Sequence, residues 1–389
     1  LWTRFRLGLF DPANRVPYSK YTLKDNDLPA HGQVALELAR QSIVLLKNDG
    51  ILPLDRTKFK QIAVIGPDAD SKSMLEGNYH GNASQPVSIL DGIKRLVGSD
   101  TKVTYALGSP ITTRPGSAPW SGQDNATKRP VGELKAEALA LAASADVIVY
   151  VGGITPAQEG ESFDRESIEL PQEQEDLVHA LHATGKPIVM VNCSGSAMAL
   201  TWEDEHLSAL VQAWYPGQEG GRAVAEVLFG IVNPSGHLPV TFYRSTADLP
   251  DFTDYSMKTR TYRYFAGKPL YVVGHGLSYT KVDYANLRVT PTNDGALTVT
   301  LDVTNSGARD GDTVVQLYAT PPASSQPQEL RALCGFRRVH LNAGEKQKIS
   351  IAVPSVALRR WDVAKKAYAI PSGNWTIAAG ASSADLPQA

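Results

Sequence analysis

The segment 147–171 carries the densest group of side chains suited to acid–base chemistry. An apolar, β-branched run from Val147 to Val151 ends in two glycines and leads into a polar loop. The charged residues of this loop are Glu159, Glu161, Asp164, Arg165 and Glu166. Neighbouring carboxylates beside an arginine can have different pKa values, which acid–base catalysis near neutral pH requires. A solvated acidic loop fixed by an Asp164–Arg165 ion pair is the alternative interpretation.

Strand and helix patterns alternate on both sides of this segment. Apolar runs predict strands, and apolar residues at helical spacing predict helices between them. We expect strands at 62–66, 102–106, 147–151, 187–192, 209–215 and 237–242, and helices at 31–47, 89–97, 132–145, 173–185 and 220–230. A Gly/Pro/Ser-rich insertion interrupts the pattern at 108–131. The alternation predicts a mostly parallel sheet with helices on both faces. The acidic loop would then lie at the carboxyl edge of that sheet, where open α/β folds bind ligands.

The pattern changes near residue 281. From Tyr284 onward, short alternating segments are separated by turn signals such as Asn-Asp-Gly and Asn-Ala-Gly. About a hundred residues of this kind predict an antiparallel β-sandwich of roughly seven strands. Before this change, the segment 260–280 is rich in aromatic residues, which can bind sugar rings or lock two domains together.

Composition narrows the classes of function. A chain of 389 residues with 42% hydrophobic content can form two or more domains. The net charge of −2 and the dispersed basic residues give no indication of a nucleic acid or an anionic membrane as partner. No apolar run approaches the roughly 18 residues of a membrane span. Cys193 and Cys334 lie in apolar surroundings and are expected to be buried free thiols.

Several common site motifs are missing. The turn after 62–66 has no phosphate-binding glycine pattern, and the turn at Ser194–Ser196 has no nucleophile elbow. The pair His179 and His182 lacks an accompanying carboxylate motif, so we expect no metal and no other cofactor.

The motifs of the chain, in their order, resemble the C-terminal part of a family 3 glycoside hydrolase, the family of β-glucosidases and β-xylosidases. The matching segments are RFRLGLFDP (4–12), SIVLLKNDGILPL (42–54), IAVIGPDAD (62–70), GNYHG (77–81), EGESFDRESIELP (159–171), WYPGQEGGRAVAEVLFG and NPSGHLPVTF (214–242) and YRYFAGKPLYVVGHGLSYT (262–280). The E-x-x-DR arrangement and the ending of the last segment look most like the β-xylosidase branch.

The resemblance implies a domain order. It implies an α/β sandwich domain at 31–245, followed by an aromatic-rich connecting segment at 246–283 and a fibronectin-III-like domain at 284–389. Residues 1–30 would be the linker from an N-terminal (β/α)8 barrel. That barrel would lie on the same precursor or on a partner chain. The sequence leaves open whether the protein forms a homo-oligomer. A secreted or periplasmic location is favoured.

The resemblance also implies a retaining, exo-acting mechanism on β-linked oligosaccharides or aryl glycosides, in the breakdown of plant polysaccharides. An Asp on the barrel would be the nucleophile, with the acid/base carboxyl about 5–5.5 Å from it. The motif places the acid/base at Glu161, with Glu159 as the alternative because the loop can be aligned one or two residues differently. Tyr79 and His80 are expected to border the substrate pocket.

Three alternatives to a β-xylosidase remain at this point. The first is a β-glucosidase of the same family. The second is a relative that favours transfer, either a transglycosylase or a phosphorylase, although a phosphorylase would use a His where the motif has Glu161. The third is a carbohydrate-binding or scaffolding module without catalysis.

Overall fold

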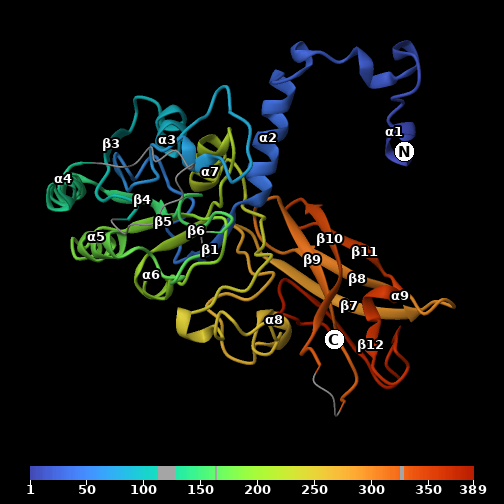
Figure 1. Cartoon of the computed structure of the whole chain (residues 1–389). Coiled ribbons are helices and arrows are strands. Elements are labelled where there is room, and N and C mark those ends of the chain that lie inside the picture. Colours follow the sequence, from blue (N-terminus) through green and yellow to red (C-terminus); the bar gives the residue numbers. More distant parts are fainter. Residues whose placement is uncertain (113–127, 163, 325–327) are drawn as a thin grey trace.

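The structure is a computed structural model that describes residues 1–112, 128–162, 164–324 and 328–389. It consists of an N-terminal arm, an α/β domain and a β-sandwich, with a long connecting segment between the two domains (Figure 1). Most of the predicted insertion at 108–131 lies outside the described residues.

A six-stranded sheet with the order β1-β6-β5-β4-β2-β3 forms the centre of the α/β domain. Its strands are β1 (Val44–Asn48), β2 (Gln61–Ile65), β3 (Lys102–Ala106), β4 (Val147–Gly153), β5 (Ile188–Cys193) and β6 (Ala209–Gln212). Strands β2 to β6 pair in parallel, and β1 pairs antiparallel with β6. Every residue of β4 and β5 is buried, as expected of strands covered on both faces. The predicted mostly parallel α/β sheet is confirmed.

Helices cover both faces of this sheet (Figure 1). The first core, on one face, contains residues of α2 (Pro29–Ser42), α3 (Ile89–Val97) and α7 (Gly220–Leu228). The second core, on the other face, contains residues of α4 (Val131–Ser144) and α5 (Gln172–His182), and α6 (Thr201–His206) packs against it. Alternate residues of β4 point to opposite cores, because strand side chains alternate between the two faces of a sheet. Val149 belongs to the first core and Tyr150 to the second.

The predicted helix at 31–47 is wrong in its last turn. Helix α2 ends at Ser42, Ile43 has an extended backbone, and the next residues form β1. The residues from Ile43 to Leu46 are all fully buried or nearly so. A short apolar run of this kind fits either a buried helix or a buried strand, and pairing with β6 decides for the strand.

The predicted strand at 237–242 is also wrong. This segment does not join the sheet, because its hydrogen bonds go to the connecting segment instead: Leu238 N–H donates to the His275 carbonyl at 2.8 Å, and Phe242 forms an isolated bridge with Tyr271. Pro239 has no N–H to offer a ladder.

The C-terminal domain is an antiparallel sandwich of two three-stranded sheets, with the orders β10-β9-β14 and β11-β8-β7. Its strands are β7 (Val282–Pro291), β8 (Leu297–Asn305), β9 (Gly311–Thr320), β10 (Ala332–Leu341), β11 (Lys346–Val353) and β14 (Thr376–Gly380). A short helix, α9 (Ser355–Leu358), and a separate hairpin of β12 (Arg360–Asp362) and β13 (Ala367–Ala369) complete the domain. The predicted antiparallel sandwich is confirmed, with six strands in its two sheets rather than seven.

The connecting segment, which includes α8 (Thr261–Tyr264), bonds to both domains. His275 lies 2.8 Å through Nε2 from the Leu46 carbonyl of β1, and Gln316 of the sandwich donates to the Gly274 carbonyl at 3.1 Å. The Tyr262 ring packs against the ring of Tyr318 at 6.0 Å. The aromatic-rich segment therefore locks the two domains together, one of the two roles that its composition suggested.

The N-terminal arm stands away from both domains (Figure 1). None of residues 1–30 is buried, although the arm contains a short helix, α1 (Trp2–Arg6). Large apolar side chains on the arm, including Trp2, Phe5 and Phe10, are more than half exposed. Exposed apolar side chains in such a number mark a surface for contact with another body.

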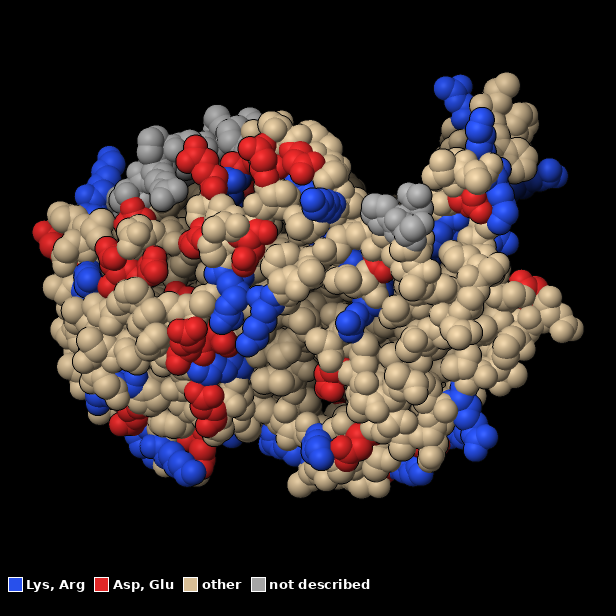
Figure 2. All heavy atoms as spheres, turned by 90° about the horizontal axis from the view of Figure 1, so that it is seen from below, with Lys and Arg blue, Asp and Glu red and all other residues tan. Residues whose placement is uncertain are grey.

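Other sequence expectations concern the surface and the cysteines. Figure 2 shows acidic and basic side chains intermixed on one face, with Lys and Arg side chains along the arm. Cys193 and Cys334 are buried free thiols, as predicted. Within the described part of the chain, no helix has both the length and the apolar character that crossing a bilayer requires.

Two glycines allow α3 and α7 to pack at contact distance. A Cβ atom on Gly92 would lie 1.9 Å from the Gly221 carbonyl oxygen, and a Cβ atom on Gly221 would lie 1.9 Å from the Ser88 carbonyl oxygen. Backbone cannot yield at such distances without moving a whole helix, so both positions require glycine.

We therefore expect Gly92→Ala to lower the free energy of unfolding by about 1–3 kcal/mol, since an added methyl group forces the two helices apart. Gly132→Ala, in α4 with open space around the added methyl group, is the matched control and should be neutral or slightly stabilising. Urea unfolding followed by circular dichroism measures both. A Gly92→Ala protein as stable as the control would contradict the close packing.

Candidate active site

The loops that carry the candidate residues leave the sheet at a point where the direction of the chain reverses. From β2 the chain runs outward to β3, and then returns to β4 on the other side of β2. The connections after β2 and β4 therefore diverge, and such a switch point at the carboxyl ends of the strands is where α/β folds bind ligands. The loop after β2 carries Tyr79 and His80, and the loop after β4 carries Glu159 and Glu161.

Glu159 is held by hydrogen bonds at both carboxyl oxygens. Its Oε1 accepts from the Gly195 N–H and the Tyr215 hydroxyl, and its Oε2 accepts from the Ser196 hydroxyl. Burial, together with the charge of Glu159, raises the pKa of Tyr215, so this phenol keeps its proton and donates. Both oxygens of Glu159 are therefore engaged in hydrogen bonds within the chain.

Glu161 has the opposite environment. It is exposed, and its one hydrogen bond from a side chain of the described structure comes from the Tyr79 hydroxyl. Tyr79 is itself 85% exposed and has a positive φ of 59°, and Ser162, next to Glu161, has a φ of 65°. Non-glycine residues with such φ values are uncommon and cluster at functional sites. Glu161 therefore stands on the outer side of the loop, where another body can reach it.

Tyr79 and His80, the two residues that were expected to border a pocket, make different contacts in the structure. Tyr79 contacts Glu161, whereas His80 lies 2.9 Å through Nδ1 from Oε2 of Glu76.

The predicted ion pair between Asp164 and Arg165 is absent from the described structure. Asp164 is exposed, and the Nη2 of Arg165 donates to Ser196 Oγ at 2.7 Å and to the Ala197 carbonyl at 3.0 Å. Burial lowers the pKa of Arg165, and the charges of Glu159 and Glu169 oppose this effect. Arg165 fixes the loop, as that interpretation held, but through the turn after β5 and not through its neighbour.

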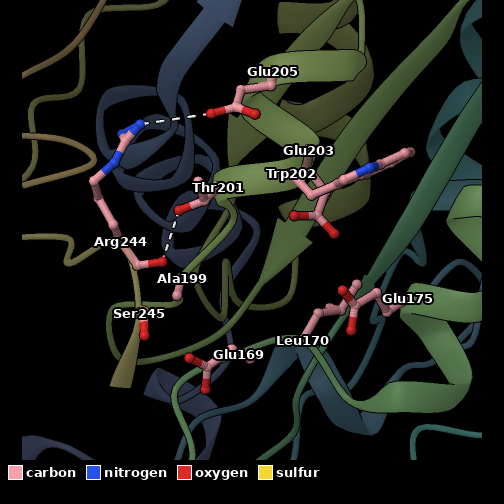
Figure 3. A pocket seen from close by; sticks show the side chains of 10 residues that line it. All are labelled: Glu169, Leu170, Glu175, Ala199, Thr201, Trp202, Glu203, Glu205, Arg244 and Ser245. Carbon is pink, nitrogen blue, oxygen red and sulfur yellow. Dashed lines mark hydrogen bonds and ion pairs between the residues drawn. The ribbon is translucent and has the colours of Figure 1, made fainter. Parts of the chain in front are cut away.

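The far end of the loop is fixed at the rim of a pocket of about 290 Å³, between α5, α6 and residues 244–245 (Figure 3). Glu169 accepts hydrogen bonds from Ser167 and from the N–H and hydroxyl of Thr246. Burial alone would raise the pKa of Glu169, but these hydrogen bonds outweigh burial and bring it to about 2.

A second carboxyl in this pocket behaves differently. Glu203 is only 3% exposed, and burial, with a further effect of the Glu175 charge, raises its pKa to about 7. Arg244 at the rim pairs with Glu205 at 3.8 Å, and its carbonyl accepts from Thr201 at 2.7 Å (Figure 3). In the described residues, no three His, Cys, Asp or Glu side chains are grouped so that they could hold a metal ion.

A buried carboxyl also lies directly after β2. Asp68 is fully buried, and neither of its carboxyl oxygens has a hydrogen-bond partner in the described structure. Burial raises the pKa of Asp68 well above its ordinary value, so the protonated form is favoured near neutral pH. The sequence showed only an acidic turn here and did not reveal this burial.

Comparison with known proteins identifies the class to which this fold and site belong. Residues 43–279 match the glycosyl hydrolase family 3 C-terminal domain, and residues 313–383 match a fibronectin type III-like domain. The chain belongs to glycosyl hydrolase family 3.

Two curated relatives carry different activities in their names. The chain is 37% identical over 414 residues to a periplasmic beta-glucosidase of Salmonella typhimurium, covering 99% of this chain and 53% of the relative. It is 32% identical over 519 residues to a xylan 1,4-beta-xylosidase of Xylanibacter ruminicola, covering 98% of this chain and 60% of the relative.

A solved family 3 exo-beta-xylosidase, in complex with a xylobiose aziridine activity-based probe, has a similar structure. The TM-score is 0.83 at 29% identity, covering 98% of this chain and 51% of that one. The chain thus spans between about half and three fifths of the length of these proteins.

The burial of Asp68 predicts a pH-dependent stability. Above the ordinary Asp pKa of about 4, the unfolded chain loses a proton that the folded chain retains, so stability falls as pH rises. Asp68→Asn replaces the carboxyl with an amide that does not ionise, so this pH dependence is lost. We expect the variant to match the parent near pH 4 and to exceed it increasingly toward pH 7, by at most about 1.4 kcal/mol per pH unit.

Urea unfolding at several pH values measures this difference, with Asp100→Asn, at an exposed acid, as control. An Asp68→Asn protein whose stability parallels that of the parent at every pH would show that Asp68 is ionised in the folded chain.

Proposed function

We propose that this chain supplies the acid/base side of the active site of a retaining, exo-acting β-glycosidase, with Glu161 as the acid/base. The observation that carries the proposal is the contrast between the two candidate carboxyls. Glu161 is exposed and, among the described residues, its side chain accepts a hydrogen bond from Tyr79 alone, whereas both oxygens of Glu159 are engaged within the chain. A general acid must be able to reach the leaving-group oxygen.

In this proposal the nucleophile is an Asp on an N-terminal (β/α)8 barrel, on the same precursor or on a partner chain. The roughly twofold greater length of the relatives supports such a further part. The exposed apolar side chains of residues 1–30 would pack against the barrel, which accounts for their exposure here.

Two proton transfers by Glu161 would then drive the reaction. Glu161 donates its proton to the glycosidic oxygen as the Asp attacks the anomeric carbon and the glycosyl-enzyme forms. The ionised Glu161 next takes a proton from the water that attacks this intermediate, which frees the sugar and restores the acid. The Tyr79 hydroxyl would orient Glu161 between these steps, and Tyr79 and His80 would border the substrate.

For the substrate we propose a β-xyloside in preference to a β-glucoside. The motif likeness to the β-xylosidase branch supports this choice, and so do the names of one curated relative and one solved structure, although another relative is named a beta-glucosidase. The same family contains the alternatives, a β-glucosidase or a transglycosylase. The name of the Salmonella relative supports a secreted or periplasmic location.

The role of Glu161 predicts a dependence on the leaving group. In the enzyme that includes the barrel, we expect Glu161→Gln to slow hydrolysis of xylobiose by about 10²–10⁴-fold, because a poor leaving group needs protonation. Aryl xylosides with good leaving groups should lose less in glycosylation. Azide should restore turnover of Glu161→Ala, since it attacks the glycosyl-enzyme without a general base.

Glu166→Gln removes an exposed carboxylate of the same loop and is the matched control. Xylobiose hydrolysis at nearly the parent rate in Glu161→Gln would reject Glu161 as the acid/base, and Glu159 would be tested next.

The substrate proposal predicts a preference that steady-state kinetics can measure. A pocket filled around a pentose leaves no space for the hydroxymethyl group of glucose, and a penalty of about 2 kcal/mol corresponds to more than tenfold in rate. We expect kcat/KM on p-nitrophenyl β-xyloside to exceed that on the β-glucoside by at least about tenfold. The reverse order would identify a β-glucosidase and leave the role of Glu161 intact.

A further inference from the structure

We propose that Glu159 is a positioning residue that holds the acid/base loop, described over residues 159–162 and 164–165, in position relative to the central sheet. This inference rests on the proposed role of Glu161. It gives Glu159 a role different from the acid/base function that the sequence left open for it.

The two ends of the loop bind the same turn, residues 195–197. At the first end, Glu159 accepts hydrogen bonds from the Gly195 N–H and the Ser196 hydroxyl. At the other end, Arg165 donates to Ser196 Oγ and to the Ala197 carbonyl. Ser196 Oγ therefore donates to one end and accepts from the other, which closes the loop on itself. Glu161 lies between the two attachments.

Residues 195–197 are themselves fixed to the sheet by buried polar groups. Asn192 of β5 donates through Nδ2 to Ser194 Oγ at 3.1 Å and to Gln212 Oε1 of β6 at 2.6 Å. Gln212 donates through Nε2 to the Ser194 carbonyl at 3.1 Å, and Ser194 Oγ donates to the Ser196 carbonyl at 2.8 Å. Asn192, Ser194 and Gln212 are at most 1% exposed. These four hydrogen bonds link the turn to β5 and β6, so the position of the turn follows that of the sheet, although the Oδ1 of Asn192 has no partner in the described residues.

Tyr215 extends the same attachment to the end of β6. Its hydroxyl donates to Glu159, and the residue before it, Trp214, has a positive φ of 60°. Trp214 is held there by its indole N–H, which donates to the Ser42 carbonyl at 3.0 Å. Glu159 thus connects the loop after β4 with the loops after β5 and β6, and no other acid of residues 159–162 and 164–165 makes such contacts.

The chemistry of these contacts predicts which substitutions are tolerated. A glutamine at position 159 keeps an oxygen that accepts from Gly195 and Tyr215, and its amide can donate to Ser196 Oγ. An alanine loses every contact. An acid/base residue, in contrast, cannot be replaced by glutamine, because an amide cannot donate and take back the catalytic proton.

The test compares Glu159→Gln, Glu159→Ala and Glu161→Gln in the enzyme that includes the barrel. We expect Glu159→Ala to lower kcat by about 10–100-fold, because a misplaced catalytic group costs that much. The loss should be larger for xylobiose than for aryl xylosides with good leaving groups, because a misplaced Glu161 protonates the leaving group poorly, so the response to glutamine separates the two roles. Glu159→Gln should recover to within about tenfold of the parent, whereas Glu161→Gln should not recover on xylobiose.

Tyr215→Phe removes one contact to Glu159, and Ser196→Ala removes the contacts of its hydroxyl to Glu159 and Arg165, so both keep the proposal testable if Glu159→Ala does not fold. Each should lower kcat on xylobiose several-fold, because each loosens the attachment that positions Glu161. Thermal unfolding shows which variants are folded.

Two results would overturn this inference. Parent-like kinetics in folded Glu159→Ala would show that the loop needs no attachment, and would leave Glu161 unaffected as the acid/base. A Glu159→Gln protein as inactive on xylobiose as Glu159→Ala, together with parent-like xylobiose hydrolysis by Glu161→Gln, would make Glu159 the acid/base. Failure of the proposed function itself has a different signature, which is normal xylobiose hydrolysis by both Glu161→Gln and Glu159→Gln.

Discussion

The hydrogen bonds among Asn192, Ser194 and Gln212 fix one turn at the carboxyl edge of the sheet, and the geometry of the candidate site depends on that turn. These groups are buried, so each of their hydrogen bonds would be costly to break. Both ends of the acid/base loop then bind to the turn. The polar loop is thereby given a position by strands that are buried on both faces.

Environment gives the carboxyls of this region different properties. Among the described residues, Asp68 is buried without a hydrogen-bond partner and its pKa is raised by burial, Glu159 accepts at both oxygens, and Glu161 is exposed with one contact, from Tyr79. Three acids on neighbouring loops therefore differ by burial and hydrogen bonding and not by residue type. One acid of the three is therefore at the surface, while the other two are used inside the chain.

The sequence predicted the elements that local periodicity sets, and it failed where hydrogen-bond partners distant in the sequence determine the structure. The helix at Ile89–Val97 and the strand at Lys102–Ala106 have the predicted bounds, because both are set by local periodicity. β1 and the segment 237–242 were wrong, because their hydrogen-bond partners lie far away in the sequence. For the same reason the loop 159–165 could be recognised, but its attachment to Ser196 could not: the Ser194–Ser196 turn had been considered only as a nucleophile elbow.

The connecting segment between the domains has a consequence for the outer edge of the sheet. β1 is an edge strand, and an open edge is a template for pairing with another molecule. Leu277 donates to the Leu45 carbonyl at 2.8 Å and His275 contacts the Leu46 carbonyl, so the free side of β1 is occupied. The join that orients the sandwich therefore also guards this edge against aggregation, and a chain cut before residue 275 would expose it.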